Sequence, residues 1–272
     1  MEEKKSFFAS LNPKSALIVG VVAGILILCT IGFLVMLGVY FGNKETSPTI
    51  AASNNDTIKP APVSVTKSDR PKVELFVMSY CPYGLQMEKA YLPAWELLQN
   101  KADIDLKFVS YAMHGLKELE ENTRQVCIQK EQPSKFISYL KCFTGKDDYK
   151  SCLAEVKITE NSLVSCINAT NKQFKILDKY NDKTTWLSGN YPLYPVNEDL
   201  NNQYGVQGSP TLVINGAQVD GVNRTAEAVK QAICAAFSNA PEECTQTLSN
   251  QAYSAGFGYE AGTANAAAEC GP

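Results

Sequence analysis

Hydrophobic and polar positions predict the first half of a folded domain that begins at residue 73. Val73–Tyr80 is a short apolar run typical of a buried strand, and Ile104–Tyr111 alternates apolar and polar positions as a second strand does. Between them, Pro82–Gln99 has the spacing of a helix, in which Pro93 predicts a kink. The domain therefore opens with a strand, a helix and a second strand.

The centre of the domain is helical, and its end returns to strands. Apolar faces predict helices at Thr123–Lys130, Lys135–Phe143, Tyr149–Val156 and Lys172–Tyr180. Thr211–Ile214 is a third strand, and the hairpin signal Asn215-Gly216 leads from it into Gln218–Val219. Thr225–Phe237 closes the domain as a helix. The predicted fold class is α/β, in the order β-α-β, a helical insert at about residues 116–182, then β-β-α.

A long apolar segment precedes the domain. Residues 15–43 carry no charged side chain, and Ala16–Phe41 is almost wholly apolar. A run of about 20 apolar residues crosses a bilayer, whereas a cleaved signal has a core of about 7–15 residues and a small-x-small site. No clean Ala-x-Ala follows this run. The pattern predicts an uncleaved transmembrane signal anchor over residues 15–43, with a removed signal peptide as the alternative.

The charges on either side of this segment predict its orientation. Lysines before the segment outnumber those just after it. We therefore expect residues 1–14 to form a cytoplasmic tail and the C-terminal domain to be extracytoplasmic.

Two segments without an apolar period flank the domain. Residues 44–72 are rich in Ser, Thr, Asn, Pro and Ala, which is typical of a flexible linker. Residues 246–272 are rich in Gly, Ala and Ser, which predicts a flexible tail. A single domain at residues 73–245 lies between them.

The composition narrows the classes of function. Hydrophobic residues make up 45% and charged residues 19% of the 272 positions, as in a globular protein. The net charge of −3 argues against a nucleic-acid partner, which usually requires a basic stripe. One histidine and the absence of a Cys-x-x-Cys pair argue against a metal site, and we expect no cofactor. Nine cysteines indicate an oxidising compartment.

The candidate chemistry lies at the start of the first helix, in Cys81-Pro82-Tyr83-Gly84. A cysteine at a helix N-terminus lies among unpaired N–H groups at the positive end of the helix dipole, which favours the thiolate. The thiolate is the form of cysteine that attacks disulfides. Cys81 is therefore the candidate nucleophile.

The order of elements around this motif resembles that of the thioredoxin fold. Ser209-Pro210-Thr211 opens the third strand, where that fold places a cis-proline facing the reactive cysteine. The resemblance implies that the catalytic residues are Cys81, Pro82 and Pro210. It also implies that the substrate groove includes Tyr83, Gly84, Ser209 and Thr211.

Val73–Cys244 also resembles the gamma-interferon-inducible lysosomal thiol reductase family and, more distantly, DsbA-like oxidoreductases. The motifs that carry this resemblance are the Cys81 segment with its following LPAWELL, MHG at Met113–Gly115, TLVING at Thr211–Gly216, and the cysteines between Cys127 and Cys244. The resemblance implies a thioredoxin-like fold and thiol–disulfide chemistry outside the cytosol.

One position departs from the family pattern. The family's redox pair is Cys-x-x-Cys, and Gly84 stands where the second cysteine belongs. Cys81 can then form a mixed disulfide, but another thiol must resolve it. Cys270 in the tail is a candidate for that resolving thiol. The motif also resembles a monothiol version of the glutaredoxin Cys-Pro-Tyr-Cys.

The other cysteines are candidates for structural disulfides. Six of them lie within the predicted domain: Cys127, Cys142, Cys152, Cys166, Cys234 and Cys244. Pairing in chain order would close local loops, at 127/142, 152/166 and 234/244, although six cysteines allow about fifteen connectivities. Cys29 lies in the apolar segment and is most simply a small hydrophobic residue.

These observations predict a membrane-anchored extracytoplasmic thiol–disulfide oxidoreductase or isomerase that uses Cys81 as its nucleophile. One alternative is a redox-inactive thioredoxin-fold module that binds Cys-containing or unfolded partners. A second alternative is a glutathione-linked monothiol enzyme. The partners of the enzyme would be Cys-containing protein substrates and an external thiol or redox partner that resolves the mixed disulfide.

Overall fold

The computed structural model describes residues 26, 29–30, 33, 65–263 and 267–272. The predicted cytoplasmic tail, most of the predicted anchor at residues 15–43 and the linker up to residue 64 lie outside the described residues. Among the residues described, no helix has the length and apolar character that a membrane crossing requires. The chain divides into two units, residues 1–58 and 59–272, and the fold below is that of the second unit.

The described strands of this unit form one four-stranded sheet in the order β2-β1-β3-β4. The strands are β1 (Lys72–Val77), β2 (Asp103–Phe108), β3 (Thr211–Ile214) and β4 (Ala217–Gln218). β1 pairs with β2 in parallel and with β3 antiparallel, and β3 and β4 form an antiparallel pair. Asn215 and Gly216 turn between β3 and β4 with positive φ angles of 50° and 83°, which confirms the predicted hairpin.

The central strand β1 is buried on both faces, and its side chains alternate between two apolar clusters. Val73, Leu75 and Val77 belong to the larger cluster, which includes residues of α2 (Pro82–Leu98) and α9 (Ala226–Ala235). Phe76 and Met78 belong to the smaller cluster, on the other face of the sheet. Cys81 lies in this smaller cluster, so the candidate site is built on the face opposite the main core.

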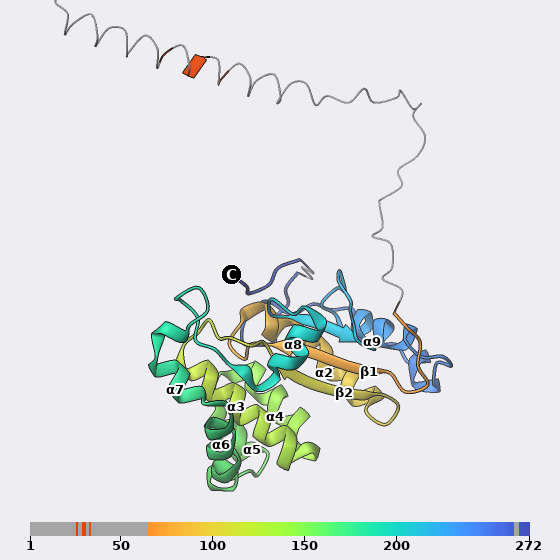
Figure 1. Ribbon diagram of the computed structural model, residues 1–272. Coiled ribbons are helices and arrows are strands. Elements are labelled where there is room, and N and C mark those ends of the chain that lie inside the picture. The colour runs from red at the N-terminus through yellow and green to blue at the C-terminus, as the bar shows by residue number, and fades with distance from the viewer. Residues whose placement is uncertain (1–25, 27–28, 31–32, 34–64, 264–266) are drawn as a thin grey trace, which may run out of the picture. The chain divides into compact units, whose positions relative to one another are not determined.

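A helical insert separates β2 from β3, as the sequence predicts. Its α-helices are α3 (Leu116–Glu131), α4 (Pro133–Lys146), α5 (Tyr149–Glu155), α6 (Glu160–Phe174) and α7 (Ile176–Asn181). Figure 1 shows these helices gathered on one side of the domain, away from α9. The chain then returns to the sheet through the 3-10 turns η2 (Lys183–Thr185) and η3 (Pro195–Asn197) and helix α8 (Glu198–Tyr204). A last 3-10 turn, η4 (Glu242–Thr245), follows α9.

Three disulfides hold the insert and the end of the domain. Cys127–Cys166 joins α3 to α6, Cys142–Cys152 joins α4 to α5, and Cys234–Cys244 joins α9 to η4. The local pairs 127/142 and 152/166 are therefore wrong, whereas the pair 234/244 is present. Pairing in chain order is wrong here because α3 packs along α6, which brings together two cysteines that are 39 positions apart. Helices α4 and α5 pack as a short hairpin of their own.

The segment after residue 245 lies along the domain, although its composition predicts a flexible tail over residues 246–272. Nζ of Lys89, a buried lysine on α2, donates hydrogen bonds to the carbonyl oxygens of Ser254 (2.8 Å), Gly256 (2.8 Å) and Gly258 (2.6 Å). Phe257 of the same segment also packs against Tyr80 and Phe143, with ring centroids 5.6 Å and 5.3 Å apart. Composition misses these contacts because backbone carbonyls and single aromatic residues, with no apolar period, hold the segment on the domain. The end of the predicted linker is held too, since Ser68 N donates to Ala236 O at 2.9 Å.

Candidate active site

Cys81 begins helix α2 and caps it. Its backbone is extended (φ −66°, ψ 121°), and its Sγ accepts a hydrogen bond from Gly84 N at 3.3 Å. Pro82 takes the first helical position, where the N–H that proline lacks would have no partner inside the helix. The first turn of α2 therefore directs its free N–H groups and the positive end of its dipole at the sulfur, which stabilises negative charge there.

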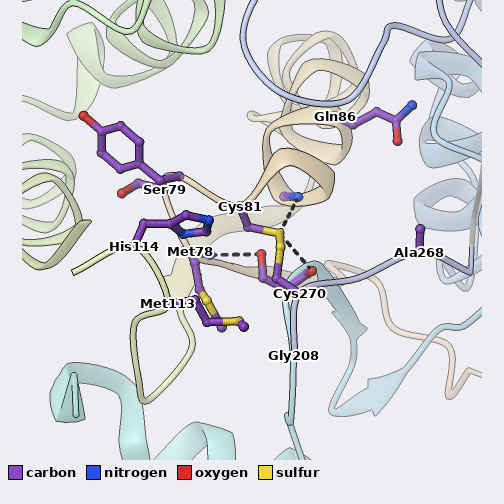
Figure 2. The surroundings of a disulfide bond; sticks show 12 residues. Met78, Ser79, Cys81, Gln86, Met113, His114, Gly208, Ala268 and Cys270 are labelled. Carbon is purple, nitrogen blue, oxygen red and sulfur yellow. Dashed lines mark hydrogen bonds between the residues drawn. A yellow bond between two sulfur atoms is a disulfide. The ribbon is translucent and has the colours of Figure 1, made fainter. Parts of the chain in front are cut away.

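Cys81 forms a disulfide with Cys270. The tail that carries Cys270 pairs with Ser209, in the loop that precedes β3. The Cα atoms of the two cysteines are 6.1 Å apart, and Cys81 is fully buried. Ser209 N donates to Cys270 O at 2.8 Å, and Cys270 N donates to Ser209 O at 2.7 Å. Figure 2 shows the disulfide between α2 and this loop, with Met113 and His114 on one side and Ala268 and Gln86 on the other.

The peptide bond between Ser209 and Pro210 is cis. Ser209 O lies 3.3 Å from Cys81 Sγ, and Ser209 Oγ accepts a hydrogen bond from Met78 N at 3.0 Å. The loop that opens β3 therefore contacts the cysteine that begins α2, next to the adjacent strands β1 and β3 of a mixed sheet. The fold is thioredoxin-like.

The chain has distant structural neighbours among solved proteins. No protein-family model matches the sequence, and no curated protein matches it. Oxidised DsbA from Mycobacterium tuberculosis has a TM-score of 0.45 and 15% identity, over 67% of this chain and 96% of that chain. The reduced disulfide bond oxidoreductase DsbG from the same organism has a TM-score of 0.44 and 15% identity, over 66% of this chain and 88% of that one. Oxidised BdbD from Bacillus subtilis has a TM-score of 0.40 and 18% identity, over 66% and 97%.

The resemblance to the gamma-interferon-inducible lysosomal thiol reductase family is not among these findings and stays a prediction. The neighbouring structures are thioredoxin-fold proteins at low identity, so the chemistry of this chain is argued from its own residues.

Gly84 leaves no room for the second cysteine of a Cys-x-x-Cys pair. A Cβ atom at this position would lie 2.6 Å from Ser209 Oγ and 3.2 Å from Met78 O. The hydroxyl of Ser209 thus occupies the space next to Cys81 that a side chain at position 84 would need. The partner sulfur comes instead from Cys270, 189 positions along the chain.

A buried carboxylate, Glu118, connects the loops on the other side of Cys81. Its oxygens accept hydrogen bonds from Tyr80 N (3.0 Å), Met113 N (2.7 Å) and His114 N (3.0 Å), and Oε1 lies 2.9 Å from His114 Nδ1. Glu118 is fully buried. It therefore fixes the residue before Cys81 and the MHG segment against each other, and it positions His114.

A buried arginine, Arg224, holds the tail on the side of the disulfide away from His114. One guanidinium nitrogen donates to Gln86 Oε1 at 3.0 Å, and the other donates to Ala268 O. The guanidinium carbon also lies 5.5 Å from the centre of the Tyr83 ring. Burial lowers the pKa of Arg224, while Tyr83 and Glu269 oppose that shift.

A pocket of about 350 Å³ opens between this arginine and the cis-proline loop. Its lining includes Pro210, Thr211, Arg224, Ala267 and Glu269. Thr211 Oγ1 donates to Gly208 O at 2.9 Å and so closes the loop behind the proline.

The structure brings together the residues that the sequence predicts for this site. Gly84 and Ser209 lie against the Cys81 sulfur. Pro82 directly follows Cys81 in the chain, and Pro210 follows Ser209. Pro210 and Thr211 line the pocket, and the ring of Tyr83 lies against Arg224. Sequence reasoning misses Arg224, Gln86 and Glu118, because each is a single polar residue whose partners lie on other elements. Among the residues described, no group of three or more His, Cys, Asp or Glu side chains is arranged to hold a metal ion.

Proposed function

We propose that this protein is a thiol–disulfide oxidoreductase whose redox couple is the Cys81–Cys270 disulfide. The observation that carries the proposal is the position of this disulfide, at the N-terminus of α2 and against the Ser209–Pro210 loop. A helix N-terminus lowers the free energy of the Cys81 thiolate, which makes Cys81 both a good leaving group and an available nucleophile. Cys270 supplies the resolving thiol that position 84 lacks.

The proposed exchange takes two steps. In the oxidising direction, a substrate thiolate attacks the Cys81 sulfur, the bond between Cys81 and Cys270 breaks, and Cys270 leaves as a thiolate. A second substrate thiolate then attacks the substrate sulfur of the mixed disulfide, which forms the substrate disulfide and releases Cys81. Two electrons pass from the substrate to the cysteine pair, and the two thiol protons pass to the released thiolates or to solvent. An external thiol–disulfide partner then reoxidises the pair.

The reverse sequence reduces a substrate disulfide, starting with attack by the Cys81 thiolate. Isomerisation needs only the first step of that sequence, followed by release through another thiol of the same substrate. The substrate class is a Cys-containing protein in each case.

We further propose that residues 15–43 anchor this domain to a membrane and that the domain works outside the cytosol. The support is the uncharged apolar segment with its preceding lysines and, independently, four disulfides within the described chain. After a carbonate wash the protein should stay with the membrane fraction. A soluble mature chain that begins near residue 45 would contradict the anchor.

The second candidate function is a redox-inactive binding module. The observation in its favour is that Cys81 is fully buried and already bonded, so that it presents no free thiol while the bond persists. The two functions differ in whether this disulfide opens at a physiological reduction potential.

The deciding experiment equilibrates the protein in buffers of graded oxidised and reduced dithiothreitol and counts the alkylated cysteines by mass spectrometry. We expect Cys81 and Cys270 to become labelled while the other three disulfides remain closed. The oxidised protein should also transfer its disulfide to a reduced test protein. Cys81→Ser should abolish transfer, and the control Cys29→Ser should leave it unchanged. If all four disulfides open together and no transfer occurs, the binding module is the better description.

A further inference from the structure

The tail lies beside the reactive cysteine as an extended peptide does when it adds to a sheet edge. Both hydrogen bonds between Ser209 and Cys270 are backbone to backbone, so they depend on the course of the peptide and not on its side chains. Gly208 permits this approach, because a Cβ atom there would lie 2.8 Å from Cys270 O. Any extended peptide that presents a cysteine in this register can make the same two bonds.

A second, independent contact holds the residues before the cysteine. Arg224 donates to the carbonyl oxygen of Ala268, two positions before Cys270, and the bond from Arg224 to Gln86 orients the guanidinium. Arg224 and Gln86 are nine-tenths or more buried. A buried arginine whose donors meet a backbone carbonyl recognises a peptide chain irrespective of its sequence, at a fixed distance from the cysteine.

The pocket beside Arg224 adds the element of selectivity. Ala267 and Glu269 line it from the tail, and Met87, Leu212 and Val222 give it an apolar wall on the domain side. The methyl group of Ala267 is the smallest side chain that such a pocket can receive, and about 350 Å³ remains open. A larger apolar side chain at that position of a peptide would bury more surface there.

On the basis of the proposed function, we propose that residues 267–270 occupy the substrate cleft as a tethered peptide. External substrates take the same path after the tail leaves: an extended segment with a cysteine paired to Ser209, a backbone carbonyl on Arg224, and an apolar residue three positions before the cysteine in the pocket. Arg224 is then a positioning residue for substrate peptides, and the Cys81–Cys270 disulfide keeps the cleft closed until a thiol opens it.

The test uses the full chain with Cys29→Ser and Cys270→Pro, so that Cys81 is the one cysteine outside the three remaining disulfides. Proline at position 270 removes both the tail thiol and the N–H that pairs with Ser209. The probes are the peptide Ala-Ala-Glu-Cys-Gly-Pro, its N-methylcysteine form and a form with leucine at the first position. Each carries thionitrobenzoate on the cysteine, and the rate of its release is divided by the rate with Ellman's reagent alone.

We expect the N-methyl peptide to react about three- to tenfold more slowly than the parent peptide, because one backbone hydrogen bond is lost. Arg224→Gln should slow the parent peptide by a similar factor, whereas the surface control Arg70→Gln should leave it unchanged. The leucine peptide should react at least about fivefold faster than the parent.

Equal normalised rates for all the peptides would overturn the cleft while leaving the proposed function intact, because Ellman's reagent still reports a reactive Cys81. Slow reaction with Ellman's reagent itself would overturn the proposed function. If the proline variant fails to fold, the same rates are measured on Cys29→Ser with Cys270→Ser, in which the tail competes equally against every probe.

Discussion

Gly84 and Ser209 fit against each other beside the Cys81 sulfur with no space for another side-chain atom. The Ser209 hydroxyl accepts from Met78 N and lies where a side chain at position 84 would project. The absence of a second cysteine in this motif is therefore built into the loop that faces it. The disulfide partner of Cys81 comes instead from another part of the chain, at Cys270.

This arrangement predicts coupling between the two residues. Gly84→Ala should lower the free energy of unfolding by about 1–3 kcal/mol, because the added methyl group overlaps the Ser209 hydroxyl. In a Ser209→Ala background the same substitution should cost less, since the overlapping oxygen is gone. A double-mutant cycle by urea unfolding measures the difference, and equal costs in both backgrounds would contradict the predicted overlap.

Residue identities in the site could be predicted only where a local motif marks them. Cys81 and Pro210 are recognisable because each stands at a junction between elements whose periods are clear. Arg224 stands in a loop, and its partners at positions 86 and 268 are far away along the chain. Glu118 has the sequence context of an ordinary solvent-exposed helix residue, yet it is buried and accepts three backbone N–H groups. Such roles depend on which loops meet, and a single sequence does not contain that information.

The elements were more predictable than their contacts. The strand at Thr211–Ile214 has the predicted bounds, and α2 runs from Pro82 to Leu98 as one helix that includes Pro93. Helix α6 was missed as a separate element, because its apolar positions are few and mainly serve the contact with α3. Disulfide pairing failed for the same reason, since it follows helix packing and not chain order.

The two insert disulfides should differ in what they contribute. In the chain-entropy model, a crosslink across 39 positions stabilises more than one across 10, by about 1 kcal/mol. Replacing Cys127 and Cys166 with alanine should therefore destabilise the protein more than replacing Cys142 and Cys152 does. Urea unfolding under non-reducing conditions compares the two double variants, and the reverse order would count against the entropic account.

The buried ammonium of Lys89 is the main polar anchor of the segment around residues 254–258. Lys89→Met would keep the length of the side chain but leave three carbonyl oxygens without their donor. We expect faster amide hydrogen exchange in this segment, with little change in β1. The control is Lys101→Met, which removes a surface ion pair with Glu243. Unchanged exchange in the Lys89 variant would show that other contacts hold the segment.

At the scale of the whole domain, a buried acid makes stability depend on pH. Glu88 on α2 is fully buried, and neither of its carboxyl oxygens has a hydrogen-bond partner among the described residues. Burial is the main cause that raises the pKa of Glu88 from its ordinary 4.5 to about 8. The nearby charge of Glu121 adds to this shift, and Lys89 opposes it. The folded protein therefore keeps this proton to a higher pH than the unfolded chain does.

The proton that the folded state keeps on Glu88 sets the direction in which stability changes with pH. Between pH 4.5 and about 8 the folded state binds more protons than the unfolded state, so stability falls as pH rises, by up to about 1.4 kcal/mol per pH unit for this group. Outside this window Glu88 adds no slope. Glu88→Gln should flatten the profile within the window, while Glu96→Gln, an exposed change on the same helix, should not. Urea unfolding at several pH values measures both, and an unchanged slope in the Glu88 variant would contradict the assignment.

The separation of 189 positions between Cys81 and Cys270 has a mechanical consequence. The Cys81–Cys270 bond closes a covalent ring that contains β2, the helical insert, β3, β4 and α9. A force applied between residue 80 and residue 271, directly on either side of the disulfide, would pass through the two sulfur atoms and leave the ring unloaded. Once that one bond is reduced, the same force would act on the elements between the cysteines, apart from the loops that the other disulfides close. Between these two points the oxidised domain therefore resists extension through a single covalent bond, and reduction makes the segment between them extensible.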